Sequence, residues 1–172
     1  MPDRPAVVVV SDASPLIILS AIGELRLLGD LFGEIRITPE VRQEVVDRGR
    51  GRPGSAEVAG ADYIRTVAVA DPRRTEQIVA DHNVGRGEAS SMALAQEIKA
   101  TVVLMDDHQA RSVAKALGIP VAGTVRILEL AHERKRVTDL AGVYRKLRST
   151  SARISLELLN QSLRRFGLPP IS

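Results

Sequence analysis

The sequence contains no cysteine, and only 2% of its 172 residues are aromatic. The absence of cysteine excludes disulfides and thiolate-bound metals, and it fits a reducing compartment such as the cytoplasm. With two tyrosines, two phenylalanines and no tryptophan, a platform of aromatic rings for stacking nucleotide bases is not expected. No apolar run approaches the roughly 18 residues needed to span a membrane. We therefore expect a cytoplasmic protein without a membrane segment.

Charge is unevenly distributed along the chain, whose formal net charge is +3. Residues 1–125 contain 14 Lys and Arg against 17 Asp and Glu, whereas residues 126–172 contain 10 against 4. A weakly acidic body followed by a basic segment permits an anionic partner such as RNA, bound through its phosphates. Solvated arginine-rich helix faces explain the same distribution without any partner.

Hydrophobic patterning predicts an α/β fold. Short β-branched runs, typical of strands buried on both faces of a parallel sheet, alternate with helical segments. The expected strands cover residues 6–10, 35–37, 64–69, 101–105 and 119–122. The polar stretch 71–87 carries no predicted element. The alternation predicts a three-layer α/β/α arrangement with a central, mostly parallel sheet.

The end of the chain is expected to add helices to the same domain. Residues 1–134 carry the strand–helix alternation, and residues 135–172 form a helical extension that packs on it. The last helix, near 153–166, has an apolar stripe that must be buried. The stripe consists of Ile154, Leu158, Leu159, Leu163 and Phe166.

Two acidic positions directly follow buried, valine-rich strands. Asp12 follows the run 6–10, and Asp106, with Asp107 beside it, follows the run 101–105. In open parallel sheets, ligands bind at the carboxyl ends of the strands. Each acid alone is also explained as the N-cap of the next helix.

Two more acids border buried helix faces. Helical spacing places Glu44 beside the stripe of Val41 and Val45. Glu88 opens a helix in which Met92, at i+4, faces the core. The alternatives are a solvated Glu44 and a Glu88 that stabilises the helix dipole by about 0.3–1 kcal/mol. Four converging carboxylates would repel one another and raise their pKa values, a conflict that Mg²⁺ or Mn²⁺ resolves while promoting phosphodiester hydrolysis.

Four segments in this order resemble the PIN-domain nucleases, in particular the branch similar to VapC-type toxins with a Gly-Glu pair before the third acid. The segments are Val9–Leu16, Val41–Val45, Gly85–Ala89 and Val103–Asp107, followed by the similar stretch Leu117–Thr124. The resemblance covers roughly residues 8–133. Each segment alone is a weak signal, but their order, spacing and placement on strands and helices make a strong one.

The resemblance implies a PIN-like fold and a metal-dependent endoribonuclease. The acids that it assigns to Mg²⁺ or Mn²⁺ are Asp12, Glu44, Glu88 and Asp106, with Asp107 as a fifth candidate. The spacing of 18 residues from Glu88 to Asp106 fits the family pattern better than the spacing to Asp107. Many members carry Ser or Thr two residues before the fourth acid, where this chain has Leu104.

The same resemblance implies partners. These are an RNA substrate, a small antitoxin protein for which this chain is the toxin, and a second copy in a homodimer. Three cations near the acids in sequence are candidate phosphate contacts, with solvated surface charge as the alternative: Arg86, Arg111 and Lys115.

Two alternatives to a ribonuclease stay open. The first is a catalytically silent PIN-like domain that binds RNA or a protein, which the missing hydroxyl at Leu104 favours. The second is a phosphatase or receiver-type domain that uses Asp12 as nucleophile or phosphoacceptor. Against it, Ser14 stands where the common Asp-x-Asp phosphatase pattern has its second aspartate.

Overall fold

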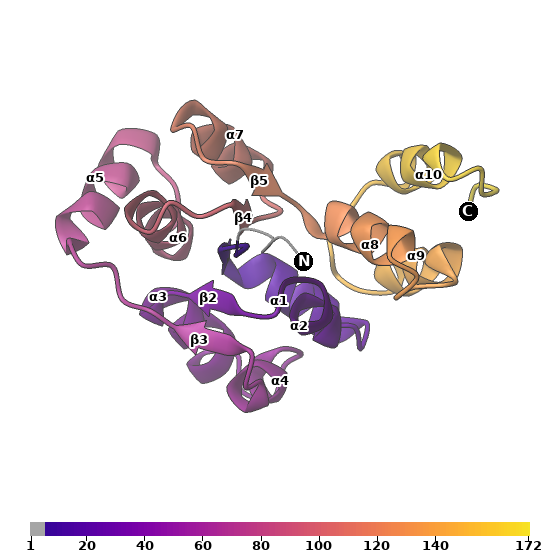
Figure 1. Ribbon diagram of the computed structural model, residues 1–172, viewed down its shortest axis with the longest axis horizontal. Coiled ribbons are helices and arrows are strands. Elements are labelled where there is room, and N and C mark those ends of the chain that lie inside the picture. Colours follow the sequence, from indigo (N-terminus) through magenta and orange to yellow (C-terminus); the bar gives the residue numbers. More distant parts are fainter. Residues whose placement is uncertain (1–5) are drawn as a thin grey trace.

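The computed structural model describes residues 6–172 and is built around a five-stranded sheet (Figure 1). The strands are β1 Val9–Ser11, β2 Ile35–Ile37, β3 Ile64–Thr66, β4 Val102–Leu104 and β5 Val121–Ala122. Their order is β3-β2-β1-β4-β5, and every neighbouring pair is parallel. The sequence predicts a mostly parallel sheet, and the sheet is parallel throughout.

Helices cover both faces of the sheet and complete the predicted three-layer α/β/α arrangement (Figure 1). Those before the last strand are α1 Ala13–Ala21, α2 Arg26–Phe32, α3 Pro39–Arg42, the π-helical turn η1 Gln43–Asp47, α4 Ser55–Gly60, α5 Pro72–His82, α6 Arg86–Glu97 and α7 His108–Ala116. Those after it are α8 Thr124–Glu133, α9 Leu140–Arg148 and α10 Leu156–Arg165. Within residues 6–172, no helix has the length and apolar character needed to cross a membrane.

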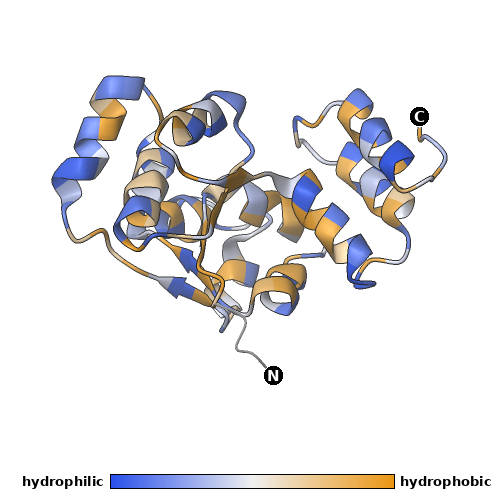
Figure 2. Ribbon diagram, turned by 45° about the horizontal axis from the view of Figure 1, so that its top comes forward, coloured by the Kyte–Doolittle hydropathy of each residue, from blue (hydrophilic) through white to orange (hydrophobic). Residues whose placement is uncertain are grey.

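The central strands divide the hydrophobic core in two. Val9 of β1 belongs to a large apolar cluster with α1, α2 and the C-terminal helices, whereas Val10 belongs to a smaller one with α5, α6 and α7. In β4, Leu104 and Val103 are divided in the same way, because successive side chains of a strand point to opposite faces. Figure 2 shows the resulting apolar interior along the strands. Burial on both faces is what the β-branched runs predict.

A helix, α5, occupies the stretch 71–87 for which the sequence analysis predicts no element. The Asp71 side chain caps it by accepting a hydrogen bond from the Arg73 backbone N–H at 3.1 Å, and Pro72 occupies the first turn. An aspartate followed by proline is a typical helix start. The buried side of α5 is narrow, with Ile78 as its apolar anchor, so few apolar residues mark this stretch of the sequence as a helix.

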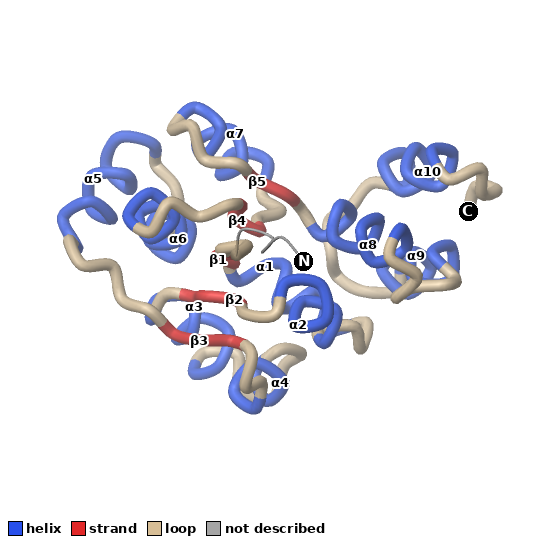
Figure 3. The backbone as a smooth tube through the Cα atoms, in the orientation of Figure 1, coloured by secondary structure: helices blue, strands red, loops and turns tan. Residues whose placement is uncertain are grey.

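The C-terminal helices α8, α9 and α10 gather at the end of the molecule opposite α5 (Figure 3). They share the large core, since Tyr144, Leu159 and Leu163 are fully buried in the same cluster as residues of β1 and β2. The Tyr144 hydroxyl lies 2.6 Å from Ser162 Oγ and joins α9 to α10. The stripe predicted on the last helix is buried only in part, because Leu158 is 43% exposed.

Truncation of Tyr144 is expected to destabilise the whole domain. Tyr144→Ala should lower the free energy of unfolding by about 3–5 kcal/mol, as expected for removal of a buried aromatic ring. Tyr144→Phe should lower it by about 1–2 kcal/mol, because the buried Ser162 hydroxyl loses its partner. Urea unfolding followed by circular dichroism measures both changes, and each variant should unfold in one transition. A separate early transition confined to α9 and α10 would contradict the shared core.

Candidate functional site

An acidic cleft of about 580 Å³ opens where β1 ends and α1 begins. Its walls come from α3, η1, the start of α6 and the loop before α7. Its charged lining residues are Asp12, Glu40, Glu44, Glu88, Asp107, Arg48 and Arg86. Five carboxylates against two guanidinium groups make the cleft negative, and its place at the carboxyl end of a parallel strand is typical of ligand sites in such sheets.

Asp12 is the most deeply buried of these acids, with 4% of its surface exposed. Its backbone N–H donates to the Leu104 carbonyl at 2.9 Å, which continues the β1–β4 ladder and fixes the residue at the strand end. Asp12 occupies the N-cap position of α1, but its side chain makes no capping hydrogen bond, and its Oδ1 is buried without a partner. The helix-cap alternative therefore does not account for Asp12.

The Asp12 carboxyl holds its proton more tightly than an ordinary aspartate. Burial is the main cause and raises its pKa from 3.8 to about 7, and the negative charges of Glu88, Glu44 and Asp106 contribute in the same direction. The backbone N–H of Ala13 opposes the rise. A carboxyl group in this environment is readily ionised only where a cation compensates the charge.

Glu44 faces Asp12 across Gly87. A Cβ atom at Gly87 would lie 2.9 Å from Glu44 Oε2 and 3.7 Å from Asp12 Oδ1, so both carboxylates border the same small space beside the glycine. Glu44 lies in η1, where the Arg48 N–H donates to the Gln43 carbonyl at 2.9 Å. The sequence predicts an ordinary helix here. Such π-turns inside helices are frequent at functional sites.

Buried hydroxyl groups tie the start of α3 to the start of α6. Thr38 Oγ1 lies 2.7 Å from Ser90 Oγ and accepts a hydrogen bond from the Val41 N–H at 3.2 Å. Ser90 Oγ donates to the Gly87 carbonyl at 2.8 Å. Thr38 and Ser90 are both fully buried. Ser90 is not among the residues predicted from the sequence; a serine on a helix face that is otherwise apolar is the signal available for it.

Glu88 is half-buried in the first turn of α6. Its Oε2 accepts a hydrogen bond from the Gly85 N–H at 3.0 Å. Burial is the main cause of its raised pKa, to which Asp107 and Glu44 add, whereas the bond from Gly85 lowers it. Glu88 therefore both stabilises the start of its helix, as the sequence alternative proposes, and lines the cleft.

The side chains of the neighbouring acids Asp106 and Asp107 lie in different surroundings: Asp107 lines the acidic cleft and Asp106 does not. Asp107 lines the cleft and caps α7 by accepting a hydrogen bond from the Ala110 N–H at 2.9 Å. Asp106 accepts hydrogen bonds from the Thr124 N–H at 2.8 Å and from its hydroxyl at 2.7 Å, and it lines adjoining grooves instead. The structure thus brings Asp107 into the cleft, whereas the sequence spacing favours Asp106. Leu104 has no hydroxyl with which to bind Asp106, and the hydroxyl that binds Asp106 belongs to Thr124 instead.

The cleft has the donor chemistry for a hard divalent cation, since its acidic side chains offer only oxygen. Asp12 Oδ1 and Glu40 Oε2 are buried without hydrogen-bond partners. In the part of the chain that the structure describes, no three His, Cys, Asp or Glu side chains form a group that could hold a metal ion as they stand. Glu88 and Asp107 are turned toward backbone N–H groups. Closure around a cation therefore requires these side chains to rotate.

The candidate phosphate contacts are divided between two sites. Arg86 lines the cleft and forms an ion pair with Glu76. Arg111 and Lys115 lie outside the cleft, in a groove beside α7 and α8. Sequence proximity to the acids therefore identified one cation of the cleft and two of a different surface.

The chain is similar to known proteins in sequence and in fold. A family model described as a PIN domain matches residues 8–168. Among solved structures, the crystal structure of PAE2754 from Pyrobaculum aerophilum aligns with a TM-score of 0.54 and 16% identity, over 74% of this chain and 97% of that chain. At that identity the similarity shows the fold alone. A search of curated proteins found no match.

Burial of Asp12 predicts a pH-dependent stability difference in metal-free protein. Because its pKa is about 7 in the folded chain and 3.8 without burial, only the folded state keeps this proton between those values. The unfolding free energy of the wild type, relative to Asp12→Asn, should therefore fall by about 1.4 kcal/mol per pH unit as the pH rises through this window, and stay constant above it. Urea titrations in EDTA at several pH values measure the difference. A difference that does not change with pH would contradict the buried, protonated carboxyl.

Proposed function

The chain belongs to the PIN-domain family, whose members are generally nucleases that use divalent metal ions, and from this premise we propose that it is a Mg²⁺- or Mn²⁺-dependent endoribonuclease. The acidic cleft is the proposed active site. The observation that carries the proposal is the buried Asp12 carboxyl, whose Oδ1 has no partner and faces the space that Glu44 also borders.

We propose that Asp12, Glu44, Glu88 and Asp107 hold the cation. Their shared lining of the cleft supports this set. A divalent cation bound there would activate water and neutralise the charge that develops on the phosphodiester. Asp12 is fixed by the strand ladder. The Thr38–Ser90 hydroxyl pair links the start of α3, which leads into η1 with Glu44, to α6 with Glu88. Arg48 and Arg86 border the cleft and offer positive charge to the RNA phosphate.

Asp106, which the sequence spacing favours as the fourth acid, is proposed to act as a positioning residue. Both of its oxygens are engaged by Thr124 at the start of α8. Its charge still contributes to the raised pKa of Asp12. Asp106 therefore tunes the cleft and anchors α8, while Asp107 stands in the cleft itself.

The finer assignments rest on the sequence resemblance. We propose that the protein is a toxin of the VapC-like branch, acts in the cytoplasm, pairs with a small antitoxin and forms a homodimer. The Gly87–Glu88 pair supports the branch, because a side chain at position 87 would meet the Glu44 carboxylate. Residues 135–172 are proposed as an extension packed on a nuclease domain of residues 1–134, which the core shared by α9 and α10 supports.

A catalytically silent PIN-like domain that binds RNA or a protein is the second candidate. The observation that favours it is that, within residues 6–172, no three acidic side chains are grouped closely enough to hold a metal ion as they stand. The phosphatase or receiver alternative has less support, because Asp12 is almost fully buried and the family match points elsewhere.

Cleavage of a mixed RNA pool by purified protein, with Mg²⁺, with Mn²⁺ and with EDTA, tests the proposal. We expect cutting only with metal, and its loss in Asp12→Asn and Glu44→Gln because each removes a carboxylate from the cation. Asp107→Asn should reduce cutting more than Asp106→Asn. The latter keeps an acceptor for Thr124, and the change of such a positioning residue should cost about 10–100-fold. Wild type and variants that are equally inactive, but still bind RNA, would establish the silent domain instead.

Gly87→Ala should weaken metal binding without lowering the free energy of unfolding. Alanine is favoured over glycine in a helix by up to about 1 kcal/mol, so the unfolding free energy should stay the same or rise. The added Cβ, 2.9 Å from Glu44 Oε2, should displace that flexible side chain and weaken Mn²⁺ binding. Calorimetric titration with Mn²⁺ measures the loss. Gly60→Ala, where a Cβ meets nothing within 4 Å, is the control, and an equal effect in both variants would remove Glu44 from the cation site.

A further inference from the structure

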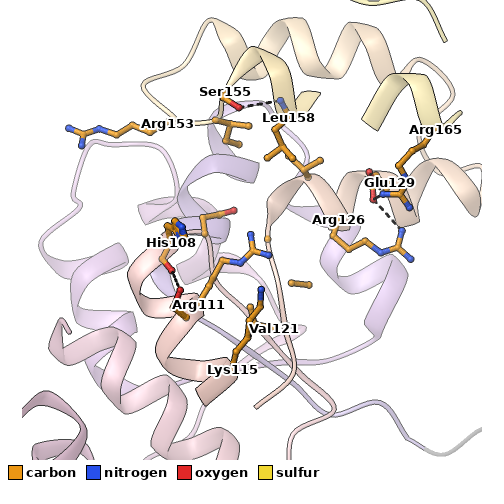
Figure 4. A pocket seen from close by; sticks show the side chains of 16 residues that line it. His108, Arg111, Lys115, Val121, Arg126, Glu129, Arg153, Ser155, Leu158 and Arg165 are labelled. Carbon is orange, nitrogen blue, oxygen red and sulfur yellow. Dashed lines mark hydrogen bonds and ion pairs between the residues drawn. The ribbon is translucent and has the colours of Figure 1, made fainter. Parts of the chain in front are cut away.

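A second cavity of about 730 Å³, here called the basic groove, lies between α7, β5, α8 and the start of α10 (Figure 4). Five of its lining residues are Lys or Arg, against two Asp or Glu. The acidic cleft has the reverse balance, with two against five. Two concave surfaces of opposite charge therefore lie on the same molecule.

The negative charges of the basic groove are already engaged. Glu129, whose side chain is 4% exposed, accepts hydrogen bonds from Arg165 at 3.0 and 3.1 Å and from Arg126 at 3.4 Å. Asp106 is bonded to Thr124. A carboxylate this deeply buried is stable only when paired. Glu129 therefore fixes the two arginines of α8 and α10 in place at one side of the groove.

Two cations of the groove have no acidic partner, since within residues 6–172 no ion pair involves Lys115 or Arg153. Arg111 lies beside Asp106, and its charge opposes the raised pKa of that carboxyl. Figure 4 shows Arg111 and Lys115 extending from α7 on the side of the groove opposite Leu158 of α10. Unpaired cations gathered on a concave surface attract a polyanion, and their long side chains reach phosphate oxygens without reading bases.

The basic groove is continuous with the acidic cleft. A cavity of about 500 Å³ lies between them. It shares His108 and Arg153 with the basic groove, and Ser14 and Asp107 with the acidic cleft. One surface track therefore runs from the cleft, past the loop before α10, into the groove.

We propose that the basic groove holds the phosphate backbone of the RNA strand whose scissile bond lies in the acidic cleft, an inference that rests on the proposed function. Without a cation, the acidic side chains of the cleft outnumber its two arginines and disfavour phosphates, so the affinity for a long strand in metal-free protein comes mostly from outside it. The groove supplies unpaired positive charge along a continuous path. With 2% aromatic residues in the chain, phosphate contacts take the place of base stacking. The loop before α10 and α10 itself thereby form one wall of the substrate path.

Equilibrium binding of labelled RNA in EDTA, where no cleavage occurs, tests the groove. The test variant is Lys115→Gln with Arg153→Gln. Its matched control is Arg145→Gln with Lys146→Gln, an exposed pair on α9 outside both cavities. Each lost phosphate contact should lower the slope of log affinity against log salt by about 0.7, which is roughly fivefold in affinity near 0.1 M salt. A dodecanucleotide should thus bind the test variant roughly 25-fold more weakly, while a trinucleotide and the control variant show no change.

The other outcomes are decisive. Unchanged dodecanucleotide affinity, or an equal loss in the control, overturns the groove as an RNA site. Loss of binding to polyglutamate with RNA affinity retained would make it a protein-binding surface and overturns the proposal as well. Groove-dependent binding by a wild type that never cleaves RNA supports the groove while refuting the nuclease. Metal-dependent cleavage of long RNA with unchanged KM in the test variant refutes the groove alone.

Discussion

The burial of a carboxylate with an unpartnered oxygen at the end of the central strand is the constraint on which the rest of the site depends. β1 is covered on both faces, so the residue that follows it enters a layer where water cannot solvate its charge. Nearby helices bring more carboxylates to the same place, and the hydroxyl pair Thr38–Ser90 prevents them from moving apart. Only a proton or a cation relieves this accumulation of negative charge. A fold that preserves it at the cost of stability is organised for a charged ligand.

Much of the fold follows from sequence patterns that act locally. The β-branched runs of β1 and β4 predict buried parallel strands because both of their faces are apolar, and the segments between them are long enough for helical crossovers. Two elements escape this reasoning for physical reasons. The helix α5 has a narrow apolar side anchored by Ile78. The π-turn η1 differs from an α-helix in its hydrogen-bond pattern, as in the bond from the Arg48 N–H to the Gln43 carbonyl, which hydrophobic spacing does not encode.

Local sequence patterns also predict most, but not all, of the acidic residues of the candidate site. Strand ends and helix faces suffice to locate Asp12, Glu44 and Glu88, and the structure gathers all three around one cleft. The choice between Asp106 and Asp107 lies beyond such reasoning. Adjacent side chains on an extended backbone point in opposite directions, and which of them meets the cleft depends on Thr124, a residue 18 positions away that binds Asp106. The spacing of the acids along the chain does not predict that contact.

The juxtaposition of a negative cleft and a positive groove gives this part of the molecule an electric dipole. A polyanion that diffuses toward the protein is attracted by the groove and repelled by the cleft at long range. The field therefore orients the polyanion before contact and also increases its rate of association. Contact then begins over α7 and α10 and reaches Asp12 last. The order of charges on the surface would thus set the direction of arrival, and the acidic residues would meet only strands that are already aligned.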